Sequence, residues 1–176
     1  GVAHCPSSNM RLSSGTAPVN RYREMGVKLG LGVDGSASND ASHMLSETRQ
    51  AMLLARLPQL SGSEETPATS TMTAREALEI ATIGGAAVLQ RNDIGSLEVG
   101  KCADFFALDL NCLDYAGALH DPVAATILCA PQKADIVVVN GKIVVDAGHI
   151  RALDMVPVIK QHNQIAYEMI NERKPQ

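Results

Sequence analysis

The stretch VKLGLGVDG at residues 27–35 decides the fold class of this chain. Its first seven residues form a short, mostly apolar run in which Gly30 and Gly32 alternate with leucine and valine. Such a run is typical of a strand that is covered on both faces, as in a parallel sheet. The strand is expected to end at Asp34 and Gly35, a pair that favours a turn.

The segments on either side of this strand repeat an alternation of strand and helix. Residues 1–4 are expected to end a buried strand, and residues 6–9 to form a polar loop. Pro18 suits the first turn of a helix that stops at Gly26, and a second helix is expected at residues 43–56. The order strand, helix, strand, helix, with short apolar strands, predicts the α/β class with parallel strands.

Two polar residues, His4 and Asp34, come at the carboxyl ends of these two strands. Because ligands bind at the carboxyl ends of parallel strands, both residues are expected at the same rim of the sheet. A carboxylate at the position of Asp34 is either a metal ligand and proton acceptor or a cap of the Asp-Gly turn. His4 is either a buried, hydrogen-bonded histidine or a group close to the site.

The segment after the first strand carries three further candidates. Asn9 and Arg11 are placed where a substrate could meet them, although Asn9 can equally cap the turn and Arg11 can equally be solvated. Cys5 is interpreted as a structural thiol. It has no second thiol with which to bind a metal and no identifiable His/Asn partner for nucleophilic catalysis.

The middle of the chain predicts a surface loop and a long helix. Residues 60–71 are rich in Ser, Thr, Pro and Glu, as surface loops are. Thr73 and Glu76 have the spacing of a capping box, which opens a helix running to about Leu89. A close helix contact or a break is expected at the glycine pair 84–85 inside this helix.

A β-rich section follows, and a last helix closes the chain. Strands are expected at residues 103–108, 135–139 and 142–145, the last two joined by an Asn-Gly hairpin turn. A turn at His120 to Pro122 is expected to precede a short helix near Val123, and residues 155–172 form the closing helix. The expected divisions are an α/β part at residues 1–93, a β-rich segment at 94–150 and a C-terminal helix at 151–176.

Composition limits the classes of function. The 176 residues are 45% hydrophobic with a net charge of −4, which favours a folded core and disfavours nucleic-acid binding. No apolar run is long enough to span a membrane. The four cysteines form no CxxC pair, which favours reduced thiols in a cytoplasmic protein. Because the first residue is Gly and the sequence starts inside an expected strand, a fragment of a longer protein is predicted.

Three stretches stand out together: GVAHCPSSNMRL at residues 1–12, LGVDGSASND at 31–40 and IGSLEVGKCAD at 94–104. They resemble the amidohydrolase superfamily, in its cytosine deaminase and atrazine chlorohydrolase branch, and they occur in the family's order. With ALHDP at residues 118–122, the chain looks closest to 8-oxoguanine deaminases and hydroxyatrazine-type ethylaminohydrolases. The resemblance covers nearly the whole sequence.

The resemblance implies a fold and a chemistry. Residues 1–93 would be the last two β/α units of a distorted (β/α)8 barrel, and residues 94–150 the C-terminal segment of a β-sandwich. One divalent metal, zinc or alternatively iron, would activate water for attack on a ring carbon that bears an amino group. Asp34 matches the aspartate that binds the metal and shuttles the proton, whereas His4 matches a residue near the site that is not a ligand. The family's other metal ligands are absent, so they would lie outside this chain.

The resemblance predicts an enzyme activity and also allows alternative activities. The chain would be the C-terminal part of a zinc-dependent hydrolase of non-peptide C–N bonds, with 8-oxoguanine, deaminated to urate and ammonia, as the favoured substrate. A triazine or hydroxyatrazine amino- or chlorohydrolase and a guanine-type deaminase are alternatives, and a non-catalytic interaction module is the rival from another class. The partner is a small heterocycle, with His4 and Asn9 close to it, and the full-length parent is expected to form a homo-oligomer.

The two glycines in the second strand predict which way one face of that strand points. Gly30 and Gly32 leave one face of that strand almost without side chains. Glycine inside a strand is tolerated mainly where something packs closely against it. The bare face is therefore expected to look into the barrel and to leave room near the metal.

Overall fold

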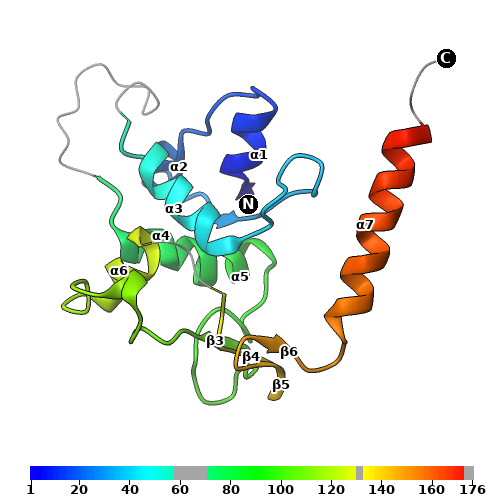
Figure 1. Ribbon diagram of the computed structural model, residues 1–176. Coiled ribbons are helices and arrows are strands. Elements are labelled where there is room, and N and C mark those ends of the chain that lie inside the picture. The colour runs from blue at the N-terminus through cyan, green and yellow to red at the C-terminus, as the bar shows by residue number, and fades with distance from the viewer. Residues whose placement is uncertain (58–70, 130–132, 173–176) are drawn as a thin grey trace. The chain divides into compact units, whose positions relative to one another are not determined.

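The computed structural model describes residues 1–57, 71–129 and 133–172 (Figure 1). The expected loop at residues 60–71 therefore lies almost entirely outside the described residues. The chain divides into two compact units. Unit 1 comprises Gly1–Cys102 and Asp109–Gln132, and unit 2 comprises Ala103–Leu108 and Lys133–Gln176.

Two short parallel strands form the sheet of unit 1. Strand β1 is Val2–His4 and strand β2 is Leu29–Leu31, with Val2 opposite Leu29 and His4 opposite Leu31. Helix α2, Val19–Glu24, lies between them in the chain, and Gly26 follows it with a φ of 68°. These elements confirm the predicted order and the parallel direction, although β2 is shorter than the apolar run that predicted it.

The expected loop at residues 6–9 is wrong, because helix α1 occupies Pro6–Arg11. Proline at the start of a helix has a suitable φ and lacks the N–H that would have no partner there. The backbone N–H of Ser7, in the first turn, donates to the Glu47 carboxylate at 3.0 Å. This partner lies 40 positions away, so the local sequence pattern could not reveal it.

Helix α3, Met44–Leu54, confirms the helix predicted at residues 43–56. It packs against α1 and against two later helices, α4 (Ala74–Glu79) and α6 (Pro122–Leu128). The Asp121 side chain caps α6 by accepting a hydrogen bond from the Ala124 N–H at 3.0 Å. The side chains of unit 1 that are less than 2% exposed include Met52, Met72, Tyr115 and Ile127.

The long helix after residue 73 begins at the predicted capping box and changes its winding at the glycine pair. The Thr73 hydroxyl accepts from the Glu76 N–H, and the Glu76 carboxylate accepts from the Thr73 N–H. After α4 the chain forms one π-helical segment, η2 (Ile80–Gly84), and then α5 (Gly85–Val88). A π-bulge of this kind inserts one residue into the helical ladder.

The glycine pair confirms the expected close helix contact. A Cβ on Gly84 would lie 2.1 Å from the carbonyl oxygen of Leu29, and a Cβ on Gly30 would lie 3.0 Å from the Cα of Gly85. Glycine on both sides thus lets the helix approach β2. The expectation that the bare face of β2 looks into a barrel is wrong at Gly30, because the helix backbone fills that side. At Gly32 a Cβ would meet the Cys5 sulfur at 3.1 Å.

Unit 2 contains a four-stranded antiparallel sheet and the closing helix. The strands, in sheet order, are β3 (Phe105–Ala107), β4 (Ile136–Val139), β5 (Lys142–Asp146) and β6 (His149–Ile150). Asn140 and Gly141 join β4 to β5 with φ values of 48° and 76°, the left-handed pair that a tight hairpin turn needs. Helix α7, Met155–Glu172, has the predicted bounds.

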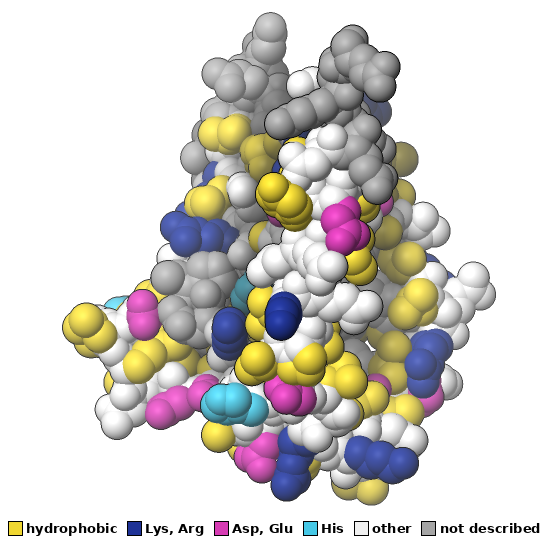
Figure 2. All heavy atoms as spheres, turned by 45° about the vertical axis from the view of Figure 1, so that its right-hand side comes forward, with side chains coloured by type: hydrophobic (Ala, Val, Ile, Leu, Met, Phe, Trp, Pro, Cys, Tyr) yellow, Lys and Arg dark blue, Asp and Glu magenta, His cyan; other side chains and the backbone are white. Residues whose placement is uncertain are grey.

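The section between β3 and β4 returns to unit 1. It contains a short 3-10 helix, η3 (Leu113–Tyr115), and then α6. On the face in Figure 2, basic and acidic side chains are interspersed among apolar ones. Among the described residues, no helix combines the length and apolar character required to cross a membrane.

Candidate active site

Asp34 lies just beyond β2, in a backbone conformation that non-glycine residues seldom adopt. Its φ is 62°, in the left-handed region that aspartate tolerates better than most residues. Its own Oδ1 accepts a hydrogen bond from the Gly35 N–H at 2.8 Å, which closes the turn. The side chain is exposed, so the carboxylate at the end of this strand is open to a ligand.

Two serine hydroxyls hold the other oxygen of this carboxylate. The Ser8 Oγ, from α1, donates to Asp34 Oδ2 at 2.6 Å, and the Ser38 Oγ lies 3.3 Å from the same atom. The two hydroxyl oxygens are 2.9 Å apart. Because a hydroxyl carries one proton, the short contact assigns the Ser8 proton to Asp34. Sequence analysis did not single out either serine.

These contacts determine the charge of Asp34. The hydrogen bond from Ser8, and then the one from the Gly35 N–H, lower the pKa of the Asp34 carboxyl below its ordinary value. Hydrogen bonds to the charged form favour that form. Asp34 is therefore an ionised, oriented and exposed carboxylate at neutral pH, which suits it to bind a cation and makes it a weaker base than an ordinary aspartate.

A second carboxylate, that of Glu47, lies buried behind this rim. Glu47 is 1% exposed, and its two oxygens accept hydrogen bonds from the Ser7 N–H at 3.0 Å and from Asn39 Nδ2 at 2.9 Å. Asn39 Nδ2 also donates to the Val33 carbonyl at 2.9 Å. Sequence analysis missed Glu47. A signal was present, because Glu47 lies within the apolar face of a predicted helix, where a charged residue is rarely buried without partners.

His4, the other residue predicted at this rim, is enclosed. It is 2% exposed, and neither ring nitrogen has a hydrogen-bond partner among the described residues. Burial lowers the pKa of His4, and the negative charge of Glu47 opposes that shift. His4 is therefore neutral at neutral pH, and within this chain it lies beside Glu47 rather than on the open surface with Asp34.

Asn9, Arg11 and Cys5 are the other candidates predicted after β1, and each lies in a different environment. The backbone carbonyl of Asn9 accepts from the Ser14 N–H at 3.0 Å, and the half-buried Asn9 side chain lies on α1. Arg11 forms an exposed ion pair with Asp40, from the loop after β2. Burial, and then the charge of Asp34, raise the pKa of Cys5, so its thiol stays protonated. A protonated thiol is a poor nucleophile, which agrees with the structural interpretation.

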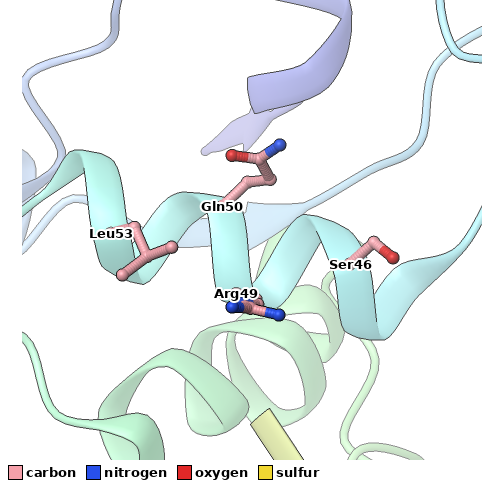
Figure 3. Close-up of a pocket in the computed structure, with 4 residues that line it drawn as sticks. All are labelled: Ser46, Arg49, Gln50 and Leu53. Atoms are coloured by element: carbon pink, nitrogen blue, oxygen red, sulfur yellow. The ribbon is translucent and has the colours of Figure 1, made fainter. Parts of the chain in front are cut away.

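A surface pocket lies on α3 (Figure 3). Ser46, Arg49, Gln50 and Leu53 line it. Arg49 and Gln50 each lie three or four positions from both Ser46 and Leu53, so the four residues share one side of the helix. Arg49 and Gln50 point in different directions from that side. None of the residues predicted for the site lines this pocket.

The model of the amidohydrolase family matches residues 1–149. The chain belongs to the amidohydrolase family. The resemblance drawn from residues 1–12, 31–40 and 94–104 is thereby confirmed.

Curated amidohydrolase relatives act on different heterocycles. The chain is 45% identical over 170 residues to an 8-oxoguanine deaminase of Pseudomonas aeruginosa, covering 97% of this chain and 36% of the relative. It is 36% identical to a 5-methylthioadenosine/S-adenosylhomocysteine deaminase of Pelotomaculum thermopropionicum, covering 97% and 38%. It is 40% identical to a hydroxydechloroatrazine ethylaminohydrolase of Pseudomonas sp. strain ADP, covering 88% and 31%. The chain thus spans between 31% and 38% of the length of these relatives.

The fold agrees with a solved amidohydrolase structure. The crystal structure of an adenosine deaminase from Xanthomonas campestris with bound zinc matches with a TM-score of 0.86 and 33% identity, covering 97% of this chain and 37% of that one. At this identity and TM-score, the α/β arrangement of the amidohydrolase fold is shared.

Asp34 is the candidate metal ligand at this rim. No three His, Cys, Asp or Glu side chains gather as a metal-binding group in the described parts of the chain. A catalytic zinc in a protein is held by about three protein ligands. Asp34 fits one of these positions, because its carboxylate is exposed, ionised and fixed by Ser8.

Proposed function

We propose that this chain is the C-terminal part of a metal-dependent aminohydrolase that removes an amino group from a nitrogen heterocycle. The single observation that carries the proposal is the exposed Asp34 carboxylate, which Ser8 holds at the carboxyl end of a parallel strand. Carboxylates are zinc ligands, and this end of the strand is where α/β enzymes place their chemistry. The relatives named as deaminases support the reaction class.

The barrel assignment belongs to the same proposal. Strands β1 and β2 would be the last two strands of a distorted (β/α)8 barrel, with residues 1–93 as its C-terminal part. The antiparallel strands within residues 94–150 would belong to a β-sandwich, followed by the C-terminal helix at 151–176. The parallel pairing of β1 with β2 and the antiparallel sheet of unit 2 support this division.

In the proposed enzyme, Asp34 would be one of the protein ligands of a divalent metal. Zinc is favoured, because the matching adenosine deaminase holds zinc, and iron is the alternative. When bound, such a metal lowers the pKa of water and makes hydroxide available at neutral pH. The remaining ligands would come from the N-terminal part that the longer relatives have.

In the proposed reaction, a carbon–oxygen bond replaces the carbon–nitrogen bond to the amino group of the heterocycle. Hydroxide oxygen forms a bond to the ring carbon, the bond from that carbon to the amino nitrogen breaks, and ammonia leaves after gaining a proton. In this proposal Asp34 accepts a proton from the attacking group and returns one to the leaving nitrogen. Ser8 and Ser38 keep its carboxylate oriented during both transfers. Positioned proton transfer is typically worth about 10²–10⁴-fold in rate.

We favour 8-oxoguanine as the substrate, which would give urate and ammonia. The 45% identity to an 8-oxoguanine deaminase supports this choice. A triazine is the alternative, which the 40% identity to a hydroxydechloroatrazine ethylaminohydrolase supports. His4 and Asn9 are proposed to lie close to the substrate in the full-length protein, and His4 has two ring nitrogens that lack partners in the described chain. The homo-oligomer remains a prediction.

The test uses the full-length protein with zinc. Ammonia release is measured with 8-oxoguanine, guanine, 5′-methylthioadenosine, S-adenosylhomocysteine and a hydroxylated aminotriazine, and bound metal is quantified in the same preparation. Deamination of one of these heterocycles, abolished by chelation and restored by zinc, is expected. Absence of ammonia release from all of them by zinc-loaded protein would overturn the proposal. Release from the triazine alone would replace the favoured substrate with the alternative.

A further inference from the structure

Two polypeptide segments meet at the candidate site, and one buried side chain links them, directly on one side and through Asn39 on the other. The first segment follows β1 and contains Ser7 and Ser8, and the second follows β2 and contains Val33 and Asp34. Ser8 reaches Asp34 directly. Glu47, on α3, joins the same two segments through other hydrogen bonds, to Ser7 and Asn39.

Each oxygen of the Glu47 carboxylate accepts a hydrogen bond that restrains one of the two segments. Oε2 accepts from the backbone N–H of Ser7, and Oε1 accepts from the side-chain amide of Asn39. That amide nitrogen also donates to the backbone carbonyl of Val33, and Asn39 is itself only 4% exposed. One carboxylate thereby holds the residue before Ser8 and, through Asn39, the residue before Asp34.

The geometry of the Ser8–Asp34 contact depends on these anchors. Ser7 lies in the first turn of α1, so its hydrogen bond to Glu47 fixes the end of the helix from which Ser8 projects. On the other side, Asp34 has a left-handed φ of 62°, a conformation that persists only where the surroundings hold it. The bond from Asn39 to the Val33 carbonyl restrains the peptide that leads into Asp34.

We propose that Glu47 is a positioning residue for Asp34, acting through Ser7 and Ser8 on one side and through Asn39 and Val33 on the other. Its importance for catalysis rests on the proposed function, since Asp34 is the group expected to bind the metal and move the proton. Replacing a residue that orients a metal ligand without contacting the metal typically lowers metal affinity or activity by about 10- to 100-fold.

The chemistry of the anchor requires a carboxylate. Both partners of Glu47 are N–H donors, and a carboxylate accepts at both oxygens. In Glu47→Gln, one of the two positions becomes an NH₂ group that faces another donor. One of the two anchors is then lost without a change in side-chain size, and a buried N–H is left without its acceptor.

The experiment compares Glu47→Gln with Glu79→Gln in the full-length protein. Glu79 is an exposed helical residue outside the site, so the control removes the same charge from the surface. The readouts are kcat, KM, zinc affinity in a competition titration with a chelator, and amide hydrogen exchange of peptides 5–12 and 33–42. For Glu47→Gln we expect a loss of about 10- to 100-fold in kcat or zinc affinity, with faster exchange in both peptides, and no comparable change for Glu79→Gln.

A double variant separates positioning from a general loss of stability. If Glu47 acts through the Ser8–Asp34 contact, the effects of Glu47→Gln and Ser8→Ala on zinc affinity are coupled, and the double variant loses less than the product of the single losses. Asn39→Ala, which breaks the link to Val33 only, is expected to give a smaller effect in the same direction. If Glu47→Gln does not fold, Asn39→Ala replaces it in the measurements of zinc affinity and hydrogen exchange.

Two results would overturn the proposal. In the first, Glu47→Gln matches Glu79→Gln in zinc affinity and in exchange of both peptides. In the second, the losses from Glu47→Gln and Ser8→Ala multiply fully, as they do for independent sites. Failure of the proposed function would look different, because wild-type protein would then release no ammonia, while the zinc and exchange measurements would still report on the anchor.

Discussion

The hydroxyl of Ser8 lies 2.6 Å from Oδ2 of Asp34, although the two residues are 26 positions apart in the chain. Ser8 is 1% exposed and Asp34 is exposed, so a buried donor holds a carboxylate at the surface. A hydrogen bond to an ionised acceptor is short and strong compared with a neutral one. The contact therefore favours the charged form and fixes the direction of the side chain that we propose as a metal ligand.

Removal of the Ser8 hydroxyl is expected to weaken the site while leaving the fold in place. Ser8→Ala in the full-length protein should lower zinc affinity or kcat by about 10- to 100-fold, the usual effect of losing a group that orients a ligand. A chelator competition and steady-state kinetics measure these quantities. Ser36→Ala, in the exposed loop after Asp34, is the matched control. Equal zinc affinity in the two variants would show that the contact does not matter for the site.

Asp34 itself is expected to be indispensable for turnover. Asp34→Asn keeps the size and one oxygen but removes the charge and the basicity, so kcat should fall by at least about 10²-fold, within the range of general acid–base catalysis. Zinc content should fall only in part, because the other proposed ligands would remain, and Asp34→Ala should reduce metal content further. Deaminase kinetics with parallel metal analysis test this. A near-normal kcat with full zinc in Asp34→Asn would identify Asp34 as a turn residue.

The adjacent glycines 84 and 85 should respond oppositely to the same substitution. In Gly84→Ala the new Cβ would lie 2.1 Å from the Leu29 carbonyl oxygen, and this backbone atom can move only if the helix and β2 separate. Overpacking typically costs about 1–3 kcal/mol and sometimes more. In Gly85→Ala the Cβ meets no atom within 4 Å, so helix propensity should stabilise the protein by roughly 0.5–1 kcal/mol.

Chemical denaturation of both variants measures these free energies of unfolding. Equal changes in the two proteins would contradict the close helix contact at Gly84, because helix propensity alone would then account for both results.

The capping box at Thr73 and Glu76 should make a pH-dependent contribution to stability. The Thr73 N–H, and to a smaller extent Arg23, lower the pKa of Glu76 below its ordinary value of 4.5. A carboxyl group whose pKa is lower in the folded state stabilises the protein above its unfolded-state pKa and loses this contribution as the pH falls through the folded-state value. The contribution of Glu76 is therefore complete at pH 7 and declines below about pH 4.5.

Two variants test the capping box. Thr73→Ala should cost about 1 kcal/mol at pH 7, the usual effect of losing a helix N-cap. Glu76→Gln should be less stable than wild type at pH 7, and the difference should shrink as the pH is lowered below 4.5. Thermal unfolding between pH 7 and pH 3 measures both effects, with Glu79→Gln as the control for charge. A difference that stays constant with pH would contradict the assignment.

Local features of the fold could be predicted from the sequence because the contacts that form them are local. The capping box joins residues 73 and 76, the hairpin turn needs only Asn140 and Gly141, and the apolar spacing within residues 155–172 is enough to bound α7. The position of Asp34 at the end of a strand could also be predicted, since it requires only the apolar run before it. Each of these depends on neighbours within a few positions.

The tertiary structure alone decided the features that depend on distant partners. Residues 6–11 are helical rather than a loop, with the N–H of Ser7 bonded to Glu47, and Gly30 is bare because Gly85 packs against it. The helix spacing places Glu47 on the apolar face of α3, but only the folded structure supplies Ser7 and Asn39, the partners of its buried carboxylate. A buried polar group needs partners to offset the loss of water, and here those partners come from segments that only folding brings together.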